Sequence, residues 1–204
     1  MCSIYIVAGP PGIGKSTYGE LFVPENLEII KMDEIAEMNK AFHYKLHREL
    51  AISKFLNTIK YNLENNIDFA FEVNLGKQHH YEFALDAKHA REGNKLNVIL
   101  FFTDDLAMCQ ERAAARFKNG KHEVNPDVLE IMYRNTIPLL KEYFQHIDDL
   151  MLVDVSRDQK PTVMAGYVKN EGYIECQGQA PNWIQQEIMP LIRAQELSGN
   201  TMAL

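Results

Sequence analysis

The residues best suited to chemistry lie near the N-terminus, where glycines and prolines precede a lysine and a serine. The run Gly9-Pro10-Pro11-Gly12-Ile13-Gly14-Lys15-Ser16 fits the pattern G-x-x-x-x-G-K-[ST], and Thr17 follows it. In this pattern backbone N–H groups surround phosphate oxygens, the lysine reaches the outer phosphates, and the serine hydroxyl ligates Mg²⁺. An apolar segment ends at Ala8, which sets the run between a strand and a helix. The sequence therefore predicts an ATP and Mg²⁺ site, against the weaker alternative of a plain turn, formed by Gly9, Pro10, Pro11, Gly12, Ile13, Gly14, Lys15, Ser16 and Thr17.

Asp33 is a candidate general base. It comes just after the apolar residues 29–32, which we expect to form a strand. Ligands of open α/β sheets bind at the carboxyl ends of the strands, so a carboxylate there is placed to take a proton from an attacking hydroxyl. The alternative is an N-cap for the helix expected from Glu34. The residues alone leave both interpretations open.

Two arginines, Arg112 and Arg116, stand four residues apart on a predicted helix, so they share one face. Cations delivered from a mobile segment stabilise the charge that develops on a transferring phosphoryl group. The polar residues 118–123 that follow have the composition of a lid loop. A solvated helix face followed by a loop is the alternative.

Three further carboxylates follow apolar runs and could lie near Mg²⁺: Glu72, Asp104 and Asp154. Spacing does not choose among them, and each could equally cap a turn or a helix. The base-reading pattern N-K-x-D of GTPases is missing from its expected place, because Asn94-Lys95-Leu96-Asn97 precedes a strand and lacks the aspartate. The pattern therefore favours an ATP-dependent enzyme.

Short apolar runs at residues 4–8, 27–32, 69–73, 96–102 and 150–155 alternate with segments of helical period at 42–63, 81–90, 106–117 and 127–144, the last kinked or interrupted at Pro138. This alternation predicts an α/β fold. We expect a P-loop NTPase three-layer sandwich with a mostly parallel central sheet and a helical lid at about 104–126. Residues 1–156 would form this domain, and residues 157–204 a C-terminal appendage packed on the core. Within the appendage we expect strands at 161–167 and 172–176, and a helix at 182–197 begun by an Asn182 cap.

Composition narrows the function classes. The 204 residues include 28 acidic and 21 basic side chains, a net charge of −7, which disfavours a nucleic-acid partner. Three cysteines far apart in the sequence predict reduced thiols, and no apolar run is long enough to cross a membrane. The apolar stretch at residues 4–8 is too short for a signal peptide and lacks a basic leader. We therefore expect a cytoplasmic protein.

Taken together, these residues resemble the zeta toxin-like P-loop kinases. The resemblance covers residues 4–156 and rests on four blocks, at 7–17, 32–36, 69–75 and 112–124. The first block is shared by many NTPases, whereas the fourth, R-x-x-x-R-x-x-x-G-x-H-x-V, is more specific. Tyr133-Arg134 also resembles the arginine-bearing helix that follows the lid in these proteins.

The resemblance implies an enzyme that transfers a phosphate from ATP to a hydroxyl of a small molecule. The toxin members act on UDP-N-acetylglucosamine and are held inactive by an antitoxin, so a nucleotide sugar and an antitoxin are the implied acceptor and partner. The implied catalytic residues are Asp33 as the base, Lys15, and Arg112 and Arg116 at the ATP phosphates. The implied acceptor-binding residues are Glu72, Asn74, Lys77, His122 and Arg134.

The acceptor segment departs from the family pattern. The family commonly has E-x-T where this chain has Glu72-Val73-Asn74, often with an arginine soon after, where only Lys77 lies nearby. An amide differs from a hydroxyl in geometry, and lysine lacks the bidentate fork of arginine, so the acceptor need not be the toxin's substrate. Two other functions stay open: a polynucleotide or nucleoside 5′-hydroxyl kinase, and a non-enzymatic ATP-binding regulatory or antitoxin-paired module.

Overall fold

The computed structural model describes residues 1–119, 124–156, 160–169, 171–175 and 179–201, and within them the chain forms one seven-stranded sheet. The strands lie in the order β2-β3-β1-β4-β5-β6-β7. The first five in this order are parallel, whereas β6 and β7 are antiparallel to their neighbours. Their bounds are β1 Ser3–Ala8, β2 Ile29–Ile30, β3 Phe69–Val73, β4 Lys95–Phe102, β5 Asp149–Asp154, β6 Thr162–Val168 and β7 Gly172–Glu175.

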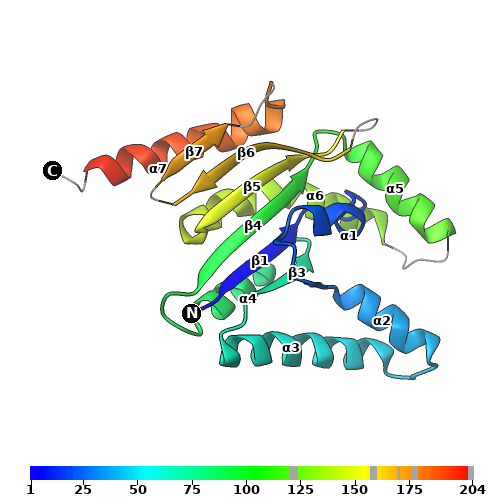
Figure 1. The fold of residues 1–204 in the computed structure, drawn as a ribbon. Helices are drawn as coiled ribbons and strands as arrows, with labels where there is room; N and C mark the ends of the chain where they lie inside the picture. The colour runs from blue at the N-terminus through cyan, green and yellow to red at the C-terminus, as the bar shows by residue number, and fades with distance from the viewer. Residues whose placement is uncertain (120–123, 157–159, 170, 176–178, 202–204) are drawn as a thin grey trace.

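Helices cover both faces of this sheet (Figure 1). Their bounds are α1 Lys15–Tyr18, α2 Met32–Ala41, α3 His47–Asn65, α4 Gln78–His89, α5 Leu106–Lys118, α6 Pro126–Tyr143 and α7 Met189–Thr201. Helices α2 and α3, which follow β2 and precede β3 in the sequence, pack against each other. The predicted three-layer α/β sandwich is confirmed. No helix in the described part of the chain is both long and apolar enough to span a membrane.

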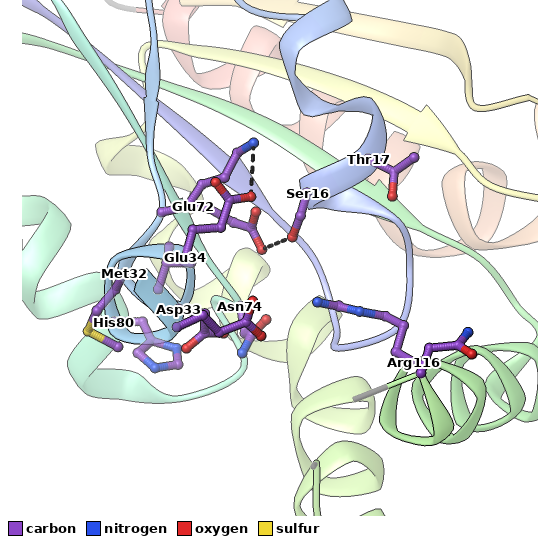
Figure 2. Close-up of a pocket in the computed structure, with 13 residues that line it drawn as sticks. Ser16, Thr17, Met32, Asp33, Glu34, Glu72, Asn74, His80 and Arg116 are labelled. Atoms are coloured by element: carbon purple, nitrogen blue, oxygen red, sulfur yellow. Dashed lines mark hydrogen bonds and ion pairs between the residues drawn. The ribbon is translucent and has the colours of Figure 1, made fainter. Parts of the chain in front are cut away.

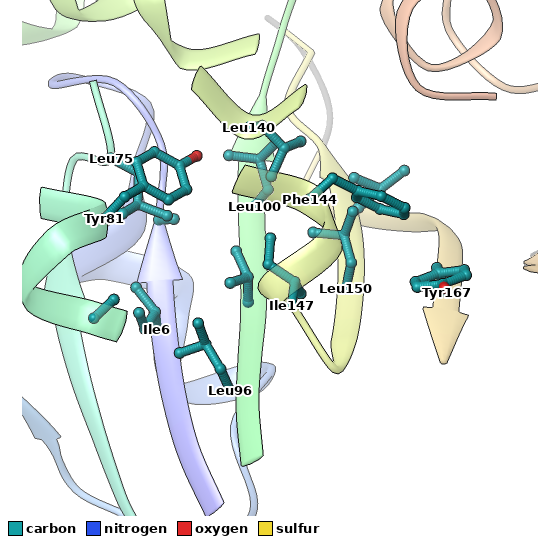
Figure 3. Close-up of a cluster of buried hydrophobic side chains, with 14 of the residues drawn as sticks. Ile6, Leu75, Tyr81, Leu96, Leu100, Leu140, Phe144, Ile147, Leu150 and Tyr167 are labelled. Carbon is teal, nitrogen blue, oxygen red and sulfur yellow. The ribbon is translucent and has the colours of Figure 1, made fainter. Parts of the chain in front are cut away.

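Alternation along the parallel strands creates the two sides of the core, because successive side chains point to opposite faces of a sheet. Ile4 and Ile6 of β1 belong to the larger buried cluster, with residues of α3, α4, α6 and α7. Figure 3 shows part of this cluster, where Leu100 of β4 lies close to Leu140 of α6. Val7 of β1 belongs to the second cluster, with residues of α5 and of the segment after α1.

Four details differ from expectation. Strand β2 is only Ile29–Ile30, and Met32 already begins α2, because Lys31 is the extended N-cap. The helix after the glycine-rich run is one turn long and continues as a 3-10 turn over Gly19–Leu21. Helix α6 runs through Pro138 without interruption. The last helix is helical from Asn182 onward, so Asn182 is not its cap, and the Pro181 carbonyl accepts from the Ile184 and Gln185 N–H groups.

The C-terminal residues share the sheet and the core of the preceding ones. Strand β6 pairs with β5, and the buried side chains of Trp183, Ile184, Ile188 and Ile192 belong to the larger core cluster. The segment over Ile184–Ile188 is a π-helix, which ends just before Pro190 in α7. A wider turn removes the close carbonyl that a proline ring would otherwise strike in an α-helix. The division into a domain at 1–156 and an appendage at 157–204 stays a prediction.

Candidate active site

The glycine-rich loop follows β1 at the carboxyl edge of the sheet, and its backbone needs glycine for steric reasons. At Gly9 (φ +139°) an added Cβ would lie 2.2 Å from the Phe101 carbonyl oxygen. At Gly12 (φ +79°) it would lie 2.2 Å from the Cys109 carbonyl oxygen. Strand β4 and helix α5 therefore hold the loop from behind, and only residues without a side chain allow this close approach.

Lys15 is almost fully buried behind the loop, with 5% of its surface exposed. Its Nζ donates to the carbonyl oxygens of Gly9 (2.9 Å) and Pro10 (3.1 Å) and to Asn74 Oδ1 (2.9 Å). Burial lowers the pKa of Lys15, which the nearby Glu72 carboxylate partly offsets. A buried ammonium already surrounded by oxygens is suited to exchange some of them for phosphate oxygens.

Glu72 is the strand-end carboxylate that reaches this loop. It lies on β3, which pairs with β1, and its Oε1 accepts a hydrogen bond from Ser16 Oγ at 3.1 Å. The same oxygen is 4.0 Å from Lys15 Nζ, and Oε2 is buried with no partner among the described residues. Asp154 instead accepts from Trp183 Nε1 at 3.0 Å. Burial raises the pKa of Asp104, whose neighbours are Trp183 and Asp154. Asp104 and Asp154 therefore both lie beside Trp183, at the start of the C-terminal helical segment.

Two cavities meet beside these groups. One, of about 360 Å³, is bounded by the glycine-rich loop, α5 and the start of α6. The other, of about 460 Å³, is bounded by α2, the end of β3 and the start of α4, and includes Thr17 (Figure 2). Five residues line both cavities: Ser16, Asp33, Glu72, Asn74 and Arg116. Asp33 lies in the first turn of α2, past the N-cap position, and its side chain lines both cavities.

The two predicted arginines separate in space. Arg116 projects from α5 toward Ser16 and Asp33 (Figure 2) and is close enough to Lys15 to lower its pKa, after burial and the opposing effect of Glu72. Arg112 does not line either cavity, and its Nη2 donates to the Ser156 carbonyl oxygen at 3.5 Å.

The predicted acceptor residues are scattered. Asn74 lines both cavities, and its Nδ2 lies 3.6 Å from Met132 Sδ. Lys77 is exposed at the N-cap of α4 and lines neither cavity. Arg134 is exposed on α6, where it pairs with Glu130 at 2.7 Å. His122 lies outside the described residues.

The structure adds residues that sequence reasoning did not select. Lys31, Glu34, Glu37, His80 and Asn119 line the larger cavity. Glu37 stands four residues after Asp33 on α2, so the i, i+4 rule could have found it. Burial lowers the pKa of His80 to about 4, helped by the positive charges of Lys77 and Lys15 and by His79, so the imidazole is neutral at physiological pH.

Comparison with known proteins rests on structure. No family model and no curated protein matches this chain. The AvrRxo1-ORF1:-ORF2 complex solved with ATP contains a chain with a TM-score of 0.64 and 9% identity, covering 86% of this chain. The PezAT toxin–antitoxin system of Streptococcus pneumoniae matches with a TM-score of 0.62 and 13% identity over 100% of this chain and 87% of its own. A chain of the Pnkp1/Rnl/Hen1 RNA repair complex matches with a TM-score of 0.53, 15% identity and 79% coverage of this chain.

This chain spans 60% of the matched AvrRxo1 chain and 48% of the matched RNA repair chain. At 9–15% identity, this similarity shows a shared fold and nothing further. The PezAT match covers the parallel sheet and the glycine-rich loop after β1, because it extends over 100% of this chain. The chain therefore shares its fold with the matched chains of the PezAT system and the AvrRxo1-ORF1:-ORF2 complex, as the P-loop fold predicted from the sequence requires.

Proposed function

We propose that the protein is an ATP- and Mg²⁺-dependent phosphotransferase that moves the γ-phosphate to a hydroxyl group of a small molecule. The observation that carries the proposal is the meeting of the two cavities at Ser16, Asp33, Glu72, Asn74 and Arg116. One cavity lies against the glycine-rich loop, where phosphates bind in this motif. The other lies beyond Asp33, where an acceptor would sit. A kinase needs such a junction, whereas a module that only binds ATP does not.

The residues at the junction suit the parts of phosphoryl transfer. The acceptor oxygen forms a bond to the γ-phosphorus, the bond from that phosphorus to the β–γ bridging oxygen breaks, and the hydroxyl proton passes to the Asp33 carboxylate. Lys15 and Arg116 would stabilise negative charge on the phosphates. Arg112, one helical turn before Arg116, lines neither cavity and donates to the Ser156 carbonyl oxygen, so this proposal assigns the contact with the phosphates to Arg116.

Mg²⁺ fits the oxygen groups beside the loop. Ser16 Oγ and the Glu72 carboxylate adjoin, and Glu72 Oε2 is a buried acceptor without a partner in the described chain. No group of three acidic, His or Cys side chains among the described residues could hold a metal alone. This agrees with the preference of Mg²⁺ for one or two protein ligands plus waters and substrate phosphates. Mg²⁺ bound there would neutralise charge on the β- and γ-phosphates.

The test is transfer from γ-labelled ATP to a panel of nucleotide sugars, nucleosides, 5′-hydroxyl oligonucleotides and simple sugars. We expect Asp33→Asn to abolish labelled product while ATP affinity stays within about twofold, because the base is needed only for transfer. Lys15→Ala should lose ATP affinity. The matched control is Asp86→Asn, an exposed residue on α4 that lines neither cavity. Tight ATP binding with no acceptor-dependent transfer would instead favour the regulatory module.

Two further proposals complete this function. The likeness to the PezAT toxin–antitoxin system supports a protein partner that holds the kinase inactive. The reduced thiols expected from the cysteine spacing support a cytoplasmic location. Co-purification from the native cell of a protein that blocks transfer would test the first, and fractionation would test the second.

A further inference from the structure

The ammonium group of Lys15 has every one of its hydrogens engaged. A lysine ammonium carries three N–H donors. Lys15 Nζ donates to the carbonyl oxygens of Gly9 and Pro10 and to Asn74 Oδ1, at 2.9, 3.1 and 2.9 Å. Only 5% of the Lys15 surface is exposed. A phosphate oxygen that binds this ammonium must therefore displace one of these acceptors.

Two of the acceptors are backbone oxygens that the loop holds in place. The Gly9 backbone approaches β4 so closely that an added Cβ would lie 2.2 Å from the Phe101 carbonyl oxygen. The Pro10 carbonyl oxygen also accepts from the Ile13 N–H at 3.4 Å, which closes a turn within the loop. The remaining acceptor belongs to a side chain, and rotation about its χ angles is enough to withdraw it. Asn74 is therefore the acceptor that a phosphate displaces.

The backbone that carries Asn74 is fixed, so only its side chain has to turn. Leu75 is fully buried with φ +49°, a left-handed conformation that a leucine keeps only where its surroundings impose it. Gly76 follows, and an added Cβ there would lie 2.7 Å from the Met132 backbone on α6. The turn after β3 is thus held against α6, and the Asn74 side chain can leave Lys15 without any change in the fold.

Asn74 also reaches the place where the acceptor would bind. It lines the cavity at the glycine-rich loop and the larger cavity beyond Asp33 (Figure 2). Its Nδ2 lies 3.6 Å from Met132 Sδ, and a thioether is a weak hydrogen-bond acceptor. When a phosphate takes over Lys15, the Asn74 carbonyl oxygen loses its strong donor, and a half-buried carbonyl oxygen without a donor is unfavourable. A hydroxyl group in the larger cavity would supply that donor.

We infer that Asn74 competes with ATP for Lys15, and that ATP binding frees the Asn74 carbonyl oxygen to accept a hydrogen bond from the molecule to be phosphorylated. The inference rests on the proposed function and adds an order of binding to it, with ATP first and the acceptor second. Because coupling between two binding sites is reciprocal, each ligand raises the affinity of the protein for the other.

The first experiment measures ATP affinity by isothermal titration calorimetry with the 204-residue chain in EDTA. We expect Asn74→Ala to bind ATP at least about threefold more tightly than wild type, because ATP then displaces no side chain from the buried ammonium. Asn74→Asp should bind ATP at least about threefold more weakly, because a carboxylate holds an ammonium more strongly than an amide does.

Asn135→Ala is the matched control. Asn135 is an exposed asparagine of α6 whose Nδ2 donates to the Gly76 carbonyl oxygen at 3.5 Å, so it touches the same turn but lines neither cavity. Its loss should leave ATP affinity within about twofold of wild type. An equal gain in Asn135→Ala and Asn74→Ala would overturn the inference, because the effect would then come from the turn and not from Lys15.

Unchanged or weaker ATP binding by Asn74→Ala would also overturn the inference. A direct contact between Asn74 and ATP predicts weaker binding, and a purely structural role predicts no gain. Failure of the proposed function looks different, because Lys15→Ala would then leave ATP affinity unchanged. The two failures are therefore separated by one further titration.

A measurement on the wild-type chain keeps the test valid if Asn74→Ala fails to fold. The side-chain amide signal of Asn74 in ¹H–¹⁵N NMR spectra should shift when AMP-PNP, an ATP analogue that resists hydrolysis, is added, and a signal that stays in place would overturn the inference. An acceptor identified in the transfer panel should bind at least about fivefold more tightly with AMP-PNP than without it. Equal affinities would count against the inference in the same way.

Discussion

Replacing Glu72 by Gln tests whether the carboxylate beside Ser16 is the protein's contribution to Mg²⁺ binding. The substitution keeps the size of the side chain and one oxygen that can accept from Ser16, but removes the charge 4.0 Å from Lys15 Nζ. Two unit charges at about 4 Å interact by about 1 kcal/mol in water and about 4 kcal/mol at a protein surface. We take about 1–3 kcal/mol as the loss in Mg²⁺ affinity, which is about 5- to 150-fold.

The assay titrates MgCl₂ at fixed ATP and follows initial rates of transfer or ATP hydrolysis. We expect the Mg²⁺ midpoint to rise by at least about fivefold, since a neutral amide is a weaker Mg²⁺ ligand than a carboxylate. ATP affinity measured in EDTA should be unchanged or improved, because a negative charge near the phosphates is gone.

Asp154→Asn is the matched control, because Asp154 is also a strand-end carboxylate but bonds Trp183 Nε1. It should lower stability by about 1 kcal/mol, or about 2–4 °C in Tm for a chain of this size, and leave the Mg²⁺ midpoint alone. An unchanged midpoint in Glu72→Gln, or an equal shift in Asp154→Asn, would refute the reasoning.

Three other predictions follow from the same geometry. Arg116→Ala should reduce kcat at least about 100-fold, against at most about tenfold for Arg112→Ala, because of these two arginines only Arg116 lines the cavities; equal losses measured in single-turnover kinetics would contradict this assignment. Gly12→Ala should destabilise the protein by about 2–4 kcal/mol and weaken ATP binding, because the new Cβ strikes the Cys109 carbonyl, and thermal melts with ATP titration check both. Deleting residues 157–204 should give insoluble or molten protein by near-UV circular dichroism, because seven of the described buried side chains leave the larger core cluster; a cooperative melt of the shortened chain would contradict this.

Local patterns carry the parts of the fold that the sequence predicts well. The run from Gly9 to Ser16 encodes its own backbone shape, since glycine and proline restrict or release φ within a few residues. Strand β3 agrees with its predicted bounds because it is buried on both faces of a parallel sheet, with Phe69 and Phe71 on one face and Ala70 on the other. Strand β2 is shorter than predicted, because the apolar run that holds it continues into the first residue of α2.

Tertiary position decides what spacing could not. Glu72, Asp104 and Asp154 look alike in sequence, and only the strand order, which pairs β3 with β1, brings Glu72 to Ser16. Arg112 and Arg116 share a helix face, but four residues advance a helix by about 6 Å and about 40°, enough for one to reach the cavities and the other Ser156. Spacing also does not predict that the carboxylates of α2 and Glu72 of β3 line one cavity, because α2 and β3 are separate parts of the chain.

The pairing of β6 with β5 has a consequence for the order of events during synthesis. While the ribosome has released only the residues up to β5, the outer edge of that strand has N–H and C=O groups without partners, and an open edge of this kind recruits other strands. The opposite edge is safer, because β2 is only two residues long. The nascent chain is therefore most prone to aggregation between the emergence of Asp154 and that of Val168, and slowing translation in that interval should lower the yield of native protein.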